Sequence, residues 1–174
     1  MTKATKRTRA LTGTAMLAAV ATILMYMEFP IPIMPGFIKM DISELPALIA
    51  SFAYGPLSGI AVCLIKNLIK LPSTSTAAVG ELFNFVMGAL FVGVAGIVYK
   101  KNKTRKGAII GAVAGALIMA LVSLPYNYFV VYPAYVVMYH LPLEAIIGMY
   151  QAINPKVNGL LACLVTFNVP FTFA

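Results

Sequence analysis

The strongest constraint on this chain is a series of apolar stretches, several close to the length of a membrane-crossing helix, separated by short polar or proline-rich breaks. Hydrophobic residues make up 61% of the 174 residues, and charged residues only 10%. A helix needs about 20 apolar residues to cross a bilayer, whose interior offers no water to satisfy backbone groups. The sequence therefore predicts an all-α integral membrane protein, with residues 1–174 forming a single membrane-embedded domain.

The breaks predict where the helices begin and end. Prolines 30, 32 and 35 should end the first span, and Pro125 and Pro133 should bend or end the fifth segment. An amphipathic helix at the membrane interface is expected within 140–158. The last apolar run is either a short span or cut before its natural end. The main apolar segments are 11–29, a short helix ending at Gly55, 56–71, the stretch from Gly80 to Tyr99, 107–137 and 159–174.

The net charge of +8 does not predict nucleic-acid binding, because nine of the thirteen basic residues flank two spans. Basic residues beside spans mark the cytoplasmic side of a membrane protein. We therefore expect a multi-pass protein with a cytoplasmic N-terminus and no nucleic-acid partner. The two clusters are Lys3, Lys6, Arg7 and Arg9 before the first span, and Lys100, Lys101, Lys103, Arg105 and Lys106 in one loop.

Acidic residues are rare and lie beside breaks in the apolar sequence. A charge at the centre of a bilayer costs about 2.5–3.5 kcal/mol on insertion scales, so these residues mark either the surface or a buried polar site. With the N-terminus inside, the parity of the spans brings all of them, together with His140, to the outer side. The five acids are Glu28, Asp41, Glu44, Glu81 and Glu144.

A first candidate site combines acids and lysines around the two short helices. Lys66 and Lys70 are one turn apart on one helix face, and cations inside a membrane are usually paired or line a cavity. With Lys39, Asp41 and Glu44 they form either a polar cavity wall or structural ion pairs. The preceding proline-rich loop, with Met34, Phe37 and Met40, is either a lid over an apolar ligand or an anchor in lipid head groups.

Two further segments combine polar and aromatic groups. Thr76, Gly80, Glu81 and Asn84 open a helix whose unpaired N–H groups can bind ligand oxygens, although ordinary capping is the alternative. Glu81 would need a cationic partner, which Lys39 or Lys70 could supply.

Asn127 lies within an apolar span, where its amide needs a partner and suits the edge of a planar heterocycle. An interfacial aromatic belt would explain some of the neighbouring tyrosines but not Asn127. The tyrosines are Tyr126, Tyr128, Tyr132 and Tyr135.

The sequence lacks the motifs of the common catalytic and metal sites. There is no GxxxxGK[ST] or HExxH motif, one histidine, and no Ser/His/Asp arrangement, so no catalytic residue and no metal ligand is predicted. Cys63 and Cys163 are expected to be small buried apolar residues. On the first helix, Ala15 and Ala19 belong to a stripe of small residues that packs either inside the protein or against a partner.

The segments FIKMDISELPALIASFAYGPLSGIAVCLIKNLIKL and STSTAAVGELFNF resemble the riboflavin-specific S component of energy-coupling factor (ECF) vitamin transporters. The similarity extends from YMEFP at Tyr26 to NVPFTF. It implies a six-helix bundle in a bacterial plasma membrane that holds riboflavin near its outer face and has no cofactor or catalytic activity. The implied partners are a membrane scaffold subunit and two cytoplasmic ATPases.

Matching positions carry the family's ligand contacts onto this chain. Thr172 stands where the family often has an asparagine, and the family's following lysine position falls past Ala174, which favours a truncated sixth helix. Ala15 and Ala19 match the stripe that faces the scaffold subunit. The alternatives are an S component for thiamine or biotin, an intramembrane enzyme, or a structural partner. With Phe37 from the proline-rich loop and Tyr128 from the aromatic segment included, the predicted substrate-site residues are Phe37, Lys39, Met40, Asp41, Thr76, Gly80, Glu81, Asn127, Tyr128 and Thr172.

Overall fold

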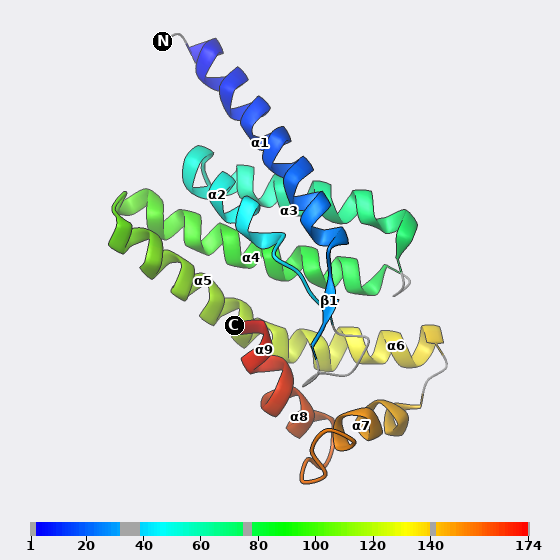
Figure 1. Cartoon of the computed structure of the whole chain (residues 1–174). Coiled ribbons are helices and arrows are strands. Elements are labelled where there is room, and N and C mark those ends of the chain that lie inside the picture. The colour runs from blue at the N-terminus through cyan, green and yellow to red at the C-terminus, as the bar shows by residue number, and fades with distance from the viewer. Residues whose placement is uncertain (1–2, 32–38, 75–77, 140–141, 174) are drawn as a thin grey trace.

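The computed structural model describes residues 3–31, 39–74, 78–139 and 142–173 (Figure 1). Its α-helices are α1 Lys3–Tyr26, α2 Glu44–Tyr54, α3 Pro56–Lys70, α4 Val79–Lys101, α5 Arg105–Tyr126, α6 Tyr132–Tyr139, α7 Leu143–Gln151, α8 Leu160–Cys163 and α9 Val169–Phe173. The remaining elements are the strands β1 Phe29–Pro30 and β2 Lys39–Met40, the 3₁₀ turn η1 Leu71–Ser73, and the π-helical turns η2 Asn127–Val131 and η3 Leu164–Asn168.

Three helices are long and apolar enough to cross a membrane: Ala4–Tyr26, Val79–Lys101 and Arg105–Met138. A shorter apolar helix covers Leu160–Phe173. Many large apolar side chains on their outer faces are exposed, including Leu121, Phe129 and Val137. Such a surface suits lipid rather than water, so the chain is a multi-pass helical membrane protein, as the sequence predicted.

The first core joins α1, α2, α3 and α4, and consists mainly of small side chains. Ala18 of α1, Ala47 and Ala50 of α2, and Val92 of α4 are buried together. Because these side chains are short, the helix backbones approach one another closely. The α2–α3 pair turns at Gly55, whose φ of 108° is a conformation that residues with a Cβ rarely adopt.

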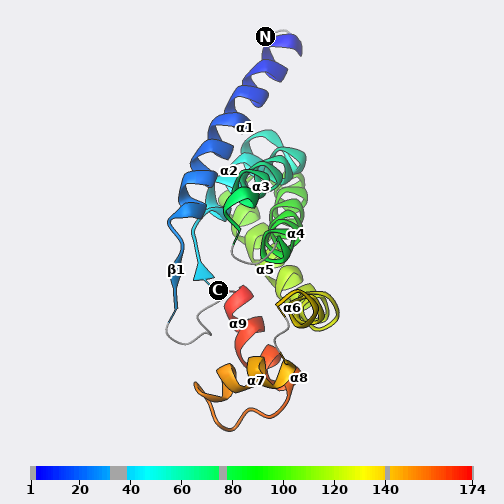
Figure 2. The ribbon, with the colours of Figure 1, turned by 90° about the vertical axis from the view of Figure 1, so that its right-hand side faces the viewer.

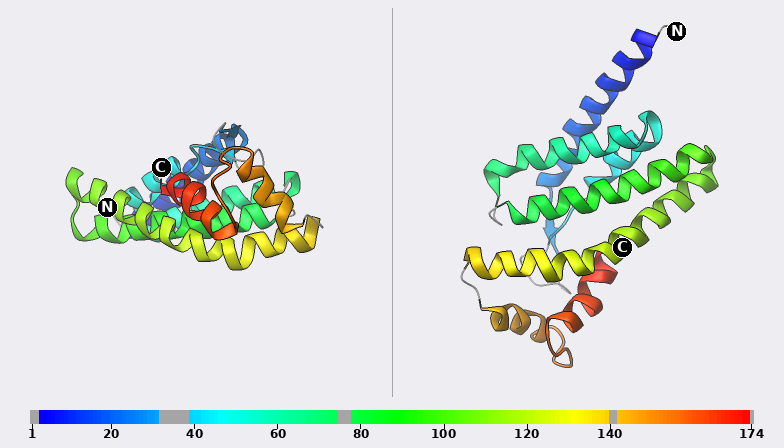
Figure 3. Two further views of the ribbon diagram at one scale, coloured as in Figure 1. Left: turned by 90° about the horizontal axis from the view of Figure 1, so that it is seen from below. Right: turned by 180° about the vertical axis from the view of Figure 1, so that it is seen from behind.

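Helices α4 and α5 form an antiparallel pair that lies side by side in Figures 1 and 3. Two glycines of α5 make this contact possible. A Cβ on Gly111 would lie 2.7 Å from the carbonyl oxygen of Ala95, and one on Gly115 would lie 2.5 Å from that of Phe91. The four-residue spacing of small residues is typical of membrane helices in close contact.

Of the two effects expected of Pro125 and Pro133, the fifth segment bends but does not end: its helix changes direction between α5 and α6 (Figure 1) and continues to Tyr139. It adapts instead by a π-turn, in which the N–H of Tyr132 donates to the carbonyl of Asn127. A second π-turn in the last helix has the N–H of Val169 donating to Leu164, one residue before Pro170. Each π-turn changes the helix register just before a proline, which itself cannot donate a backbone hydrogen bond.

A second, smaller core forms where α6, α7 and the last helix (Leu160–Phe173) meet. The α5 and α6 helices lie between this core and the α2–α3 pair (Figures 1 and 2). Its centre is a buried hydrogen-bonded triad. The hydroxyls of Tyr132 and Tyr150 lie 2.5 Å apart, Tyr150 donates to Asn168 Oδ1 at 2.8 Å, and Asn168 Nδ2 donates to Tyr132 at 3.3 Å. A buried hydrogen-bonded network of this kind favours one arrangement of the three elements.

The first helix differs in extent from its predicted span. It begins at Lys3 rather than Leu11, because the basic segment that precedes the apolar run is also helical, and it projects away from the bundle at its N-terminal end (Figure 2). It ends at Tyr26, before an extended segment. There Phe29 pairs with Met40 and Pro30 with Lys39 in a short antiparallel hairpin, where the sequence had predicted only an extended loop.

Candidate functional site

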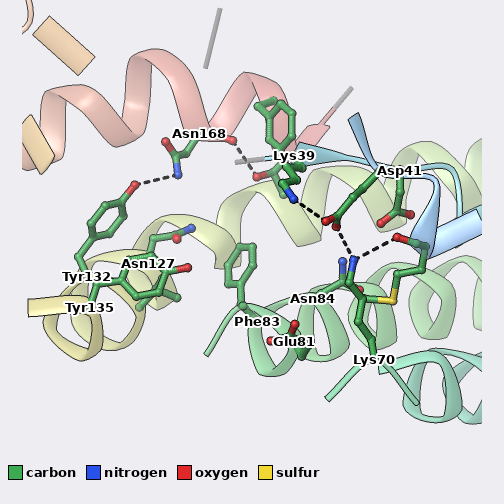
Figure 4. Close-up of a pocket in the computed structure, with 16 residues that line it drawn as sticks. Lys39, Asp41, Lys70, Glu81, Phe83, Asn84, Asn127, Tyr132, Tyr135 and Asn168 are labelled. Atoms are coloured by element: carbon green, nitrogen blue, oxygen red, sulfur yellow. Dashed lines mark hydrogen bonds and ion pairs between the residues drawn. The ribbon is translucent and has the colours of Figure 1, made fainter. Parts of the chain in front are cut away.

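Four parts of the chain that are far apart in sequence enclose one cavity of about 210 Å³ (Figure 4). They are the end of α1 with the β1–β2 hairpin, the end of α3 with the start of α4, the α5–α6 junction, and the last helix. The lining residues are Met25, Glu28, Lys39, Asp41, Lys70, Gly80, Glu81, Phe83, Asn84, Asn127, Val131, Tyr132, Tyr135, Asn168, Phe171 and Thr172.

One wall of the cavity is an ion-paired bridge centred on Glu28. Its Oε1 accepts from Lys39 Nζ at 2.6 Å, and its Oε2 accepts from Lys70 Nζ. Lys70 also donates to the carbonyl of Met25 at 3.1 Å, at the end of α1. Burial by itself raises the pKa of the Glu28 carboxyl, but the hydrogen bonds and charges of the two lysines outweigh burial and lower that pKa below its ordinary 4.5.

The other predicted lysine, Lys66, does not reach the cavity. It is fully buried between the short helices, where Nζ donates to Ser43 Oγ and Glu44 Oε1, both at 2.6 Å. The sequence allowed this cluster to be either structural ion pairs or a cavity wall, and the structure contains both. Lys66 and Glu44 form a structural ion pair, whereas Lys39, Asp41 and Lys70 line the cavity.

The start of α4 supplies a second polar wall. Ala78 immediately before it has a left-handed φ of 68°, a backbone conformation that residues with a Cβ adopt only under constraint. Gly80, Glu81 and Asn84 then face the cavity from the first turns of the helix. Thr74 Oγ1 donates to Glu81 Oε2 at 2.7 Å. The partner expected for Glu81 was Lys39 or Lys70, but both of those lysines bind Glu28 instead.

The opposite side of the cavity carries two buried asparagines, one in each π-turn. Asn127 Nδ2 donates to the carbonyl of Ser123 at 2.8 Å, which leaves its amide oxygen as an acceptor. Asn168 is held by both tyrosines of the buried triad, Tyr132 and Tyr150. π-turns are often found at functional sites, and here both coincide with a cavity residue.

Aromatic side chains complete the walls between these polar groups. Phe83 comes from α4, Tyr132 and Tyr135 from α6, and Phe171 from the last helix. The ring centroids of Tyr132 and Tyr135 are 6.2 Å apart, and the two rings pack edge to face. The cavity therefore combines flat apolar surfaces with amides, carboxylates and ammonium groups.

The structure brings six of the ten predicted substrate residues to this cavity: Lys39, Asp41, Gly80, Glu81, Asn127 and Thr172. Two others are placed elsewhere. Met40 pairs with Phe29 in the hairpin, and Tyr128 lines a separate shallow hollow beside α7 and α8. Phe37 and Thr76, like Met34 and His140, lie outside the described residues.

Several lining residues were not among the predicted ones. Glu28 had been recognised only as an acid beside a break, and no sequence signal connects it with lysines eleven and forty-two positions away. Asn168 did have a signal, because it is an asparagine in an apolar run shortly before a proline, as Asn127 is. No sequence signal separates the apolar lining residues from ordinary core residues. The lining residues that were not predicted are Met25, Glu28, Phe83, Val131, Asn168 and Phe171.

The small-residue stripe of α1 divides between two faces. Ala18 is buried in the first core, and Gly13 packs under the Tyr54 ring, whereas Ala15 and Ala19 are exposed. Within the described part of the chain, no group of three or more His, Cys, Asp or Glu residues could hold a metal ion.

The fold and the cavity define a multi-pass membrane protein with a polar and aromatic cavity among its helix ends. Residues 9–174 match the family model described as ECF transporter, substrate-specific component. The chain therefore belongs to the substrate-specific components of ECF transporters. It also superimposes, with a TM-score of 0.70 and 29% identity, on a solved S component of a bacterial ECF transporter, covering 96% of this chain and 92% of that one.

Curated relatives are similar over most of the chain. A riboflavin transporter RibU of Staphylococcus aureus is 35% identical over 157 residues, which cover 90% of this chain and 77% of that protein. The riboflavin transporter FmnP of Bacillus subtilis is 37% identical over 131 residues, covering 74% and 69%. A RibU of Streptococcus thermophilus is 33% identical over 165 residues, covering 93% and 75%.

Proposed function

We propose that this chain is the high-affinity riboflavin-binding subunit of an ECF-type, ATP-driven vitamin uptake transporter. The proposal rests on the cavity that four distant segments enclose in a chain of this family. Its relatives are riboflavin transporters, which favours this vitamin over thiamine or biotin.

The chemistry of the cavity suits a flat heteroaromatic ligand with a polar tail. Phe83 and Tyr135 offer ring faces, and the amides of Asn127 and Asn168 offer a donor or an acceptor to a ring edge. Nanomolar binding requires about −12 kcal/mol. Burial of apolar ligand surface at about 25 cal/mol per Å² supplies part of it, and oriented hydrogen bonds add specificity.

The proposed orientation has the N-terminus in the cytoplasm of a bacterial cell and the cavity toward the outside. Each long helix has a basic end and an end at the cavity. The cavity ends are at Met25 in α1, Gly80 in α4 and Asn127 beyond α5, and the basic ends are the start of α1, the end of α4 at Lys101 and the start of α5 at Arg105. Basic ends favour the cytoplasmic side, so the cavity is placed to capture ligand from the outer side. About twenty residues of helix between the two ends span roughly 30 Å.

The proposed partners are the membrane scaffold subunit of an ECF transporter and two cytoplasmic ATPase subunits. The exposed Ala15 and Ala19 of α1 offer a small-residue face for close contact with a helix of the scaffold. In this proposal the chain itself is not an enzyme, uses no cofactor, and carries riboflavin only as cargo.

The test is a fluorescence titration of the purified chain in detergent. Riboflavin fluorescence should be quenched with a dissociation constant in the nanomolar range, whereas an excess of thiamine or biotin should not compete. Saturable binding of thiamine or biotin without riboflavin binding would assign the cavity to another vitamin. Absence of binding by all three would contradict the proposed function.

A further inference from the structure

Two lysines at the cavity share one carboxylate, that of Glu28. Lys39 and Lys70 come from β2 and α3, and both ammonium groups reach the carboxylate of Glu28, one at each oxygen. Figure 4 shows these ion pairs as dashed lines at the cavity wall. Two lysines that converge on separate oxygens of one anion would bind a phosphate group in the same way.

Lys70 has a second partner besides Glu28, and the backbone of Lys39 is held by strand pairing. Lys70 is 8% exposed and also donates to the Met25 carbonyl in the last turn of α1, the negative end of that helix. Lys39 belongs to the strand β2, which pairs with β1. Removing the Glu28 charge would therefore leave two cations beside the cavity without their counter-ion.

The rest of the lining opposes an anionic ligand. The charged lining residues are three carboxylates, on Glu28, Asp41 and Glu81, and two ammonium groups, so their formal net charge is minus one. A phosphomonoester carries a charge of about −1.5 to −2 at pH 7. Such a group would meet the lysines only by displacing Glu28 into the same cavity, beside the other carboxylates.

We propose that Lys39 and Lys70 form an anion-binding subsite that Glu28 occupies, and that Glu28 thereby selects a neutral ligand over its phosphorylated form. The inference rests on the proposed function only in its choice of riboflavin as the neutral ligand. Glu28 is then a specificity-determining residue, because it occupies the two lysines that would otherwise bind the phosphate group of a ligand.

The test compares riboflavin with flavin mononucleotide, its phosphate ester, by fluorescence titration of wild type and Glu28→Gln. The ratio of the two affinities should shift toward the phosphate ester by at least about tenfold in Glu28→Gln, because both lysines become available to phosphate. The shift should be lost in the double variant Glu28→Gln/Lys70→Met.

Asp41→Asn is the matched control, because it removes one negative charge from the same cavity. Asp41 Oδ1 accepts from the backbone N–H of Ser43 and has no lysine partner among the described residues, so its loss exposes no cation pair. An unchanged affinity ratio in Glu28→Gln, or an equal shift in Asp41→Asn, would overturn the inference.

A second measurement needs no flavin. Inorganic phosphate, compared with chloride at equal ionic strength, should raise the melting temperature of Glu28→Gln and of Glu28→Ala but not that of wild type. Absence of this rise in both variants would also overturn the inference. If wild type binds no riboflavin but the phosphate effect is present, the proposed function fails and the anion site stands.

Discussion

Asn127 illustrates how one buried polar side chain can indicate a ligand-binding site. It is 4% exposed inside an apolar helix, and only its amide nitrogen is used, by the carbonyl of Ser123. Asn127 lines the cavity, so a ligand that brings a hydrogen-bond donor can pair with its amide oxygen. This makes Asn127 a residue whose contribution is larger with ligand than without it.

We expect Asn127→Leu to weaken riboflavin binding by about 1–3 kcal/mol, or roughly five- to 150-fold, while the protein stays folded. The titration is to be paired with a melting curve in detergent. Asn158→Leu, an exposed loop position, is the control and should leave affinity unchanged. Unaltered affinity in Asn127→Leu would remove Asn127 from the site.

Glu28 predicts a pH dependence of stability. Its pKa is lowered in the folded protein, so the ion-paired bridge stabilises the fold fully above the ordinary pKa of 4.5. That contribution is lost as the pH falls through the lowered value, where the carboxylate is protonated and Lys39 and Lys70 lose their shared partner. Asp41 and Glu81 also line this cavity and add their own acid titration.

The measurement is the difference in melting temperature between wild type and Glu28→Gln across pH. Wild type should be more stable by about 1 kcal/mol near neutral pH, and the difference should vanish in acid. Taking the difference removes the shared titration of the other carboxylates. A difference that is constant from neutral to acid pH would show that the bridge contributes nothing through its charge.

At the scale of elements, the α2–α3 pair depends on a buried charge. Lys66 is fully buried, and its ammonium group is shared by Ser43 and Glu44 from the preceding helix. Gly88 of α4 lies directly beside the Glu44 carboxylate, where a Cβ would come within 2.5 Å of Oε1. The Lys66–Glu44 ion pair is therefore packed between α2, α3 and α4.

Lys66→Met should destabilise the protein by about 3–5 kcal/mol, because it leaves the Glu44 carboxylate without its cation. Thermal unfolding in detergent measures this. The double variant Glu44→Gln/Lys66→Met should recover much of the loss, and Lys156→Met, at an exposed position, should have little effect. A double variant as unstable as Lys66→Met would mean that packing, and not charge, explains the loss.

At the scale of the molecule, much of the architecture could be predicted from hydropathy, because long apolar runs in a membrane must be helices. The prolines of the fifth segment were harder to interpret. Pro133 signals a disturbance, but whether a helix ends or forms a π-turn depends on what surrounds it. The tertiary environment of η2, and not the local sequence, decides that outcome.

The candidate site was partly predictable for a related reason. Asn127, Glu81 and Asp41 are polar residues in apolar surroundings, and such residues need a reason to be there. The pairing of Glu28 with Lys39 and Lys70 was not predictable, since it depends on how the end of α1 meets the end of α3. Thr172 and Asn168 likewise reach the cavity only because the last helix packs against α5.

We propose that the α1 end, the α4 start, the α5–α6 junction and the last helix enclose the flavin together. Single cysteines at Phe83, Val131 and Thr172 test it by maleimide labelling, with Lys156→Cys as an exposed control; native Cys63 and Cys163 are both buried. Riboflavin should protect all three cavity positions from labelling and leave the labelling of the control unchanged. Equal labelling of the three positions with and without bound riboflavin would contradict it.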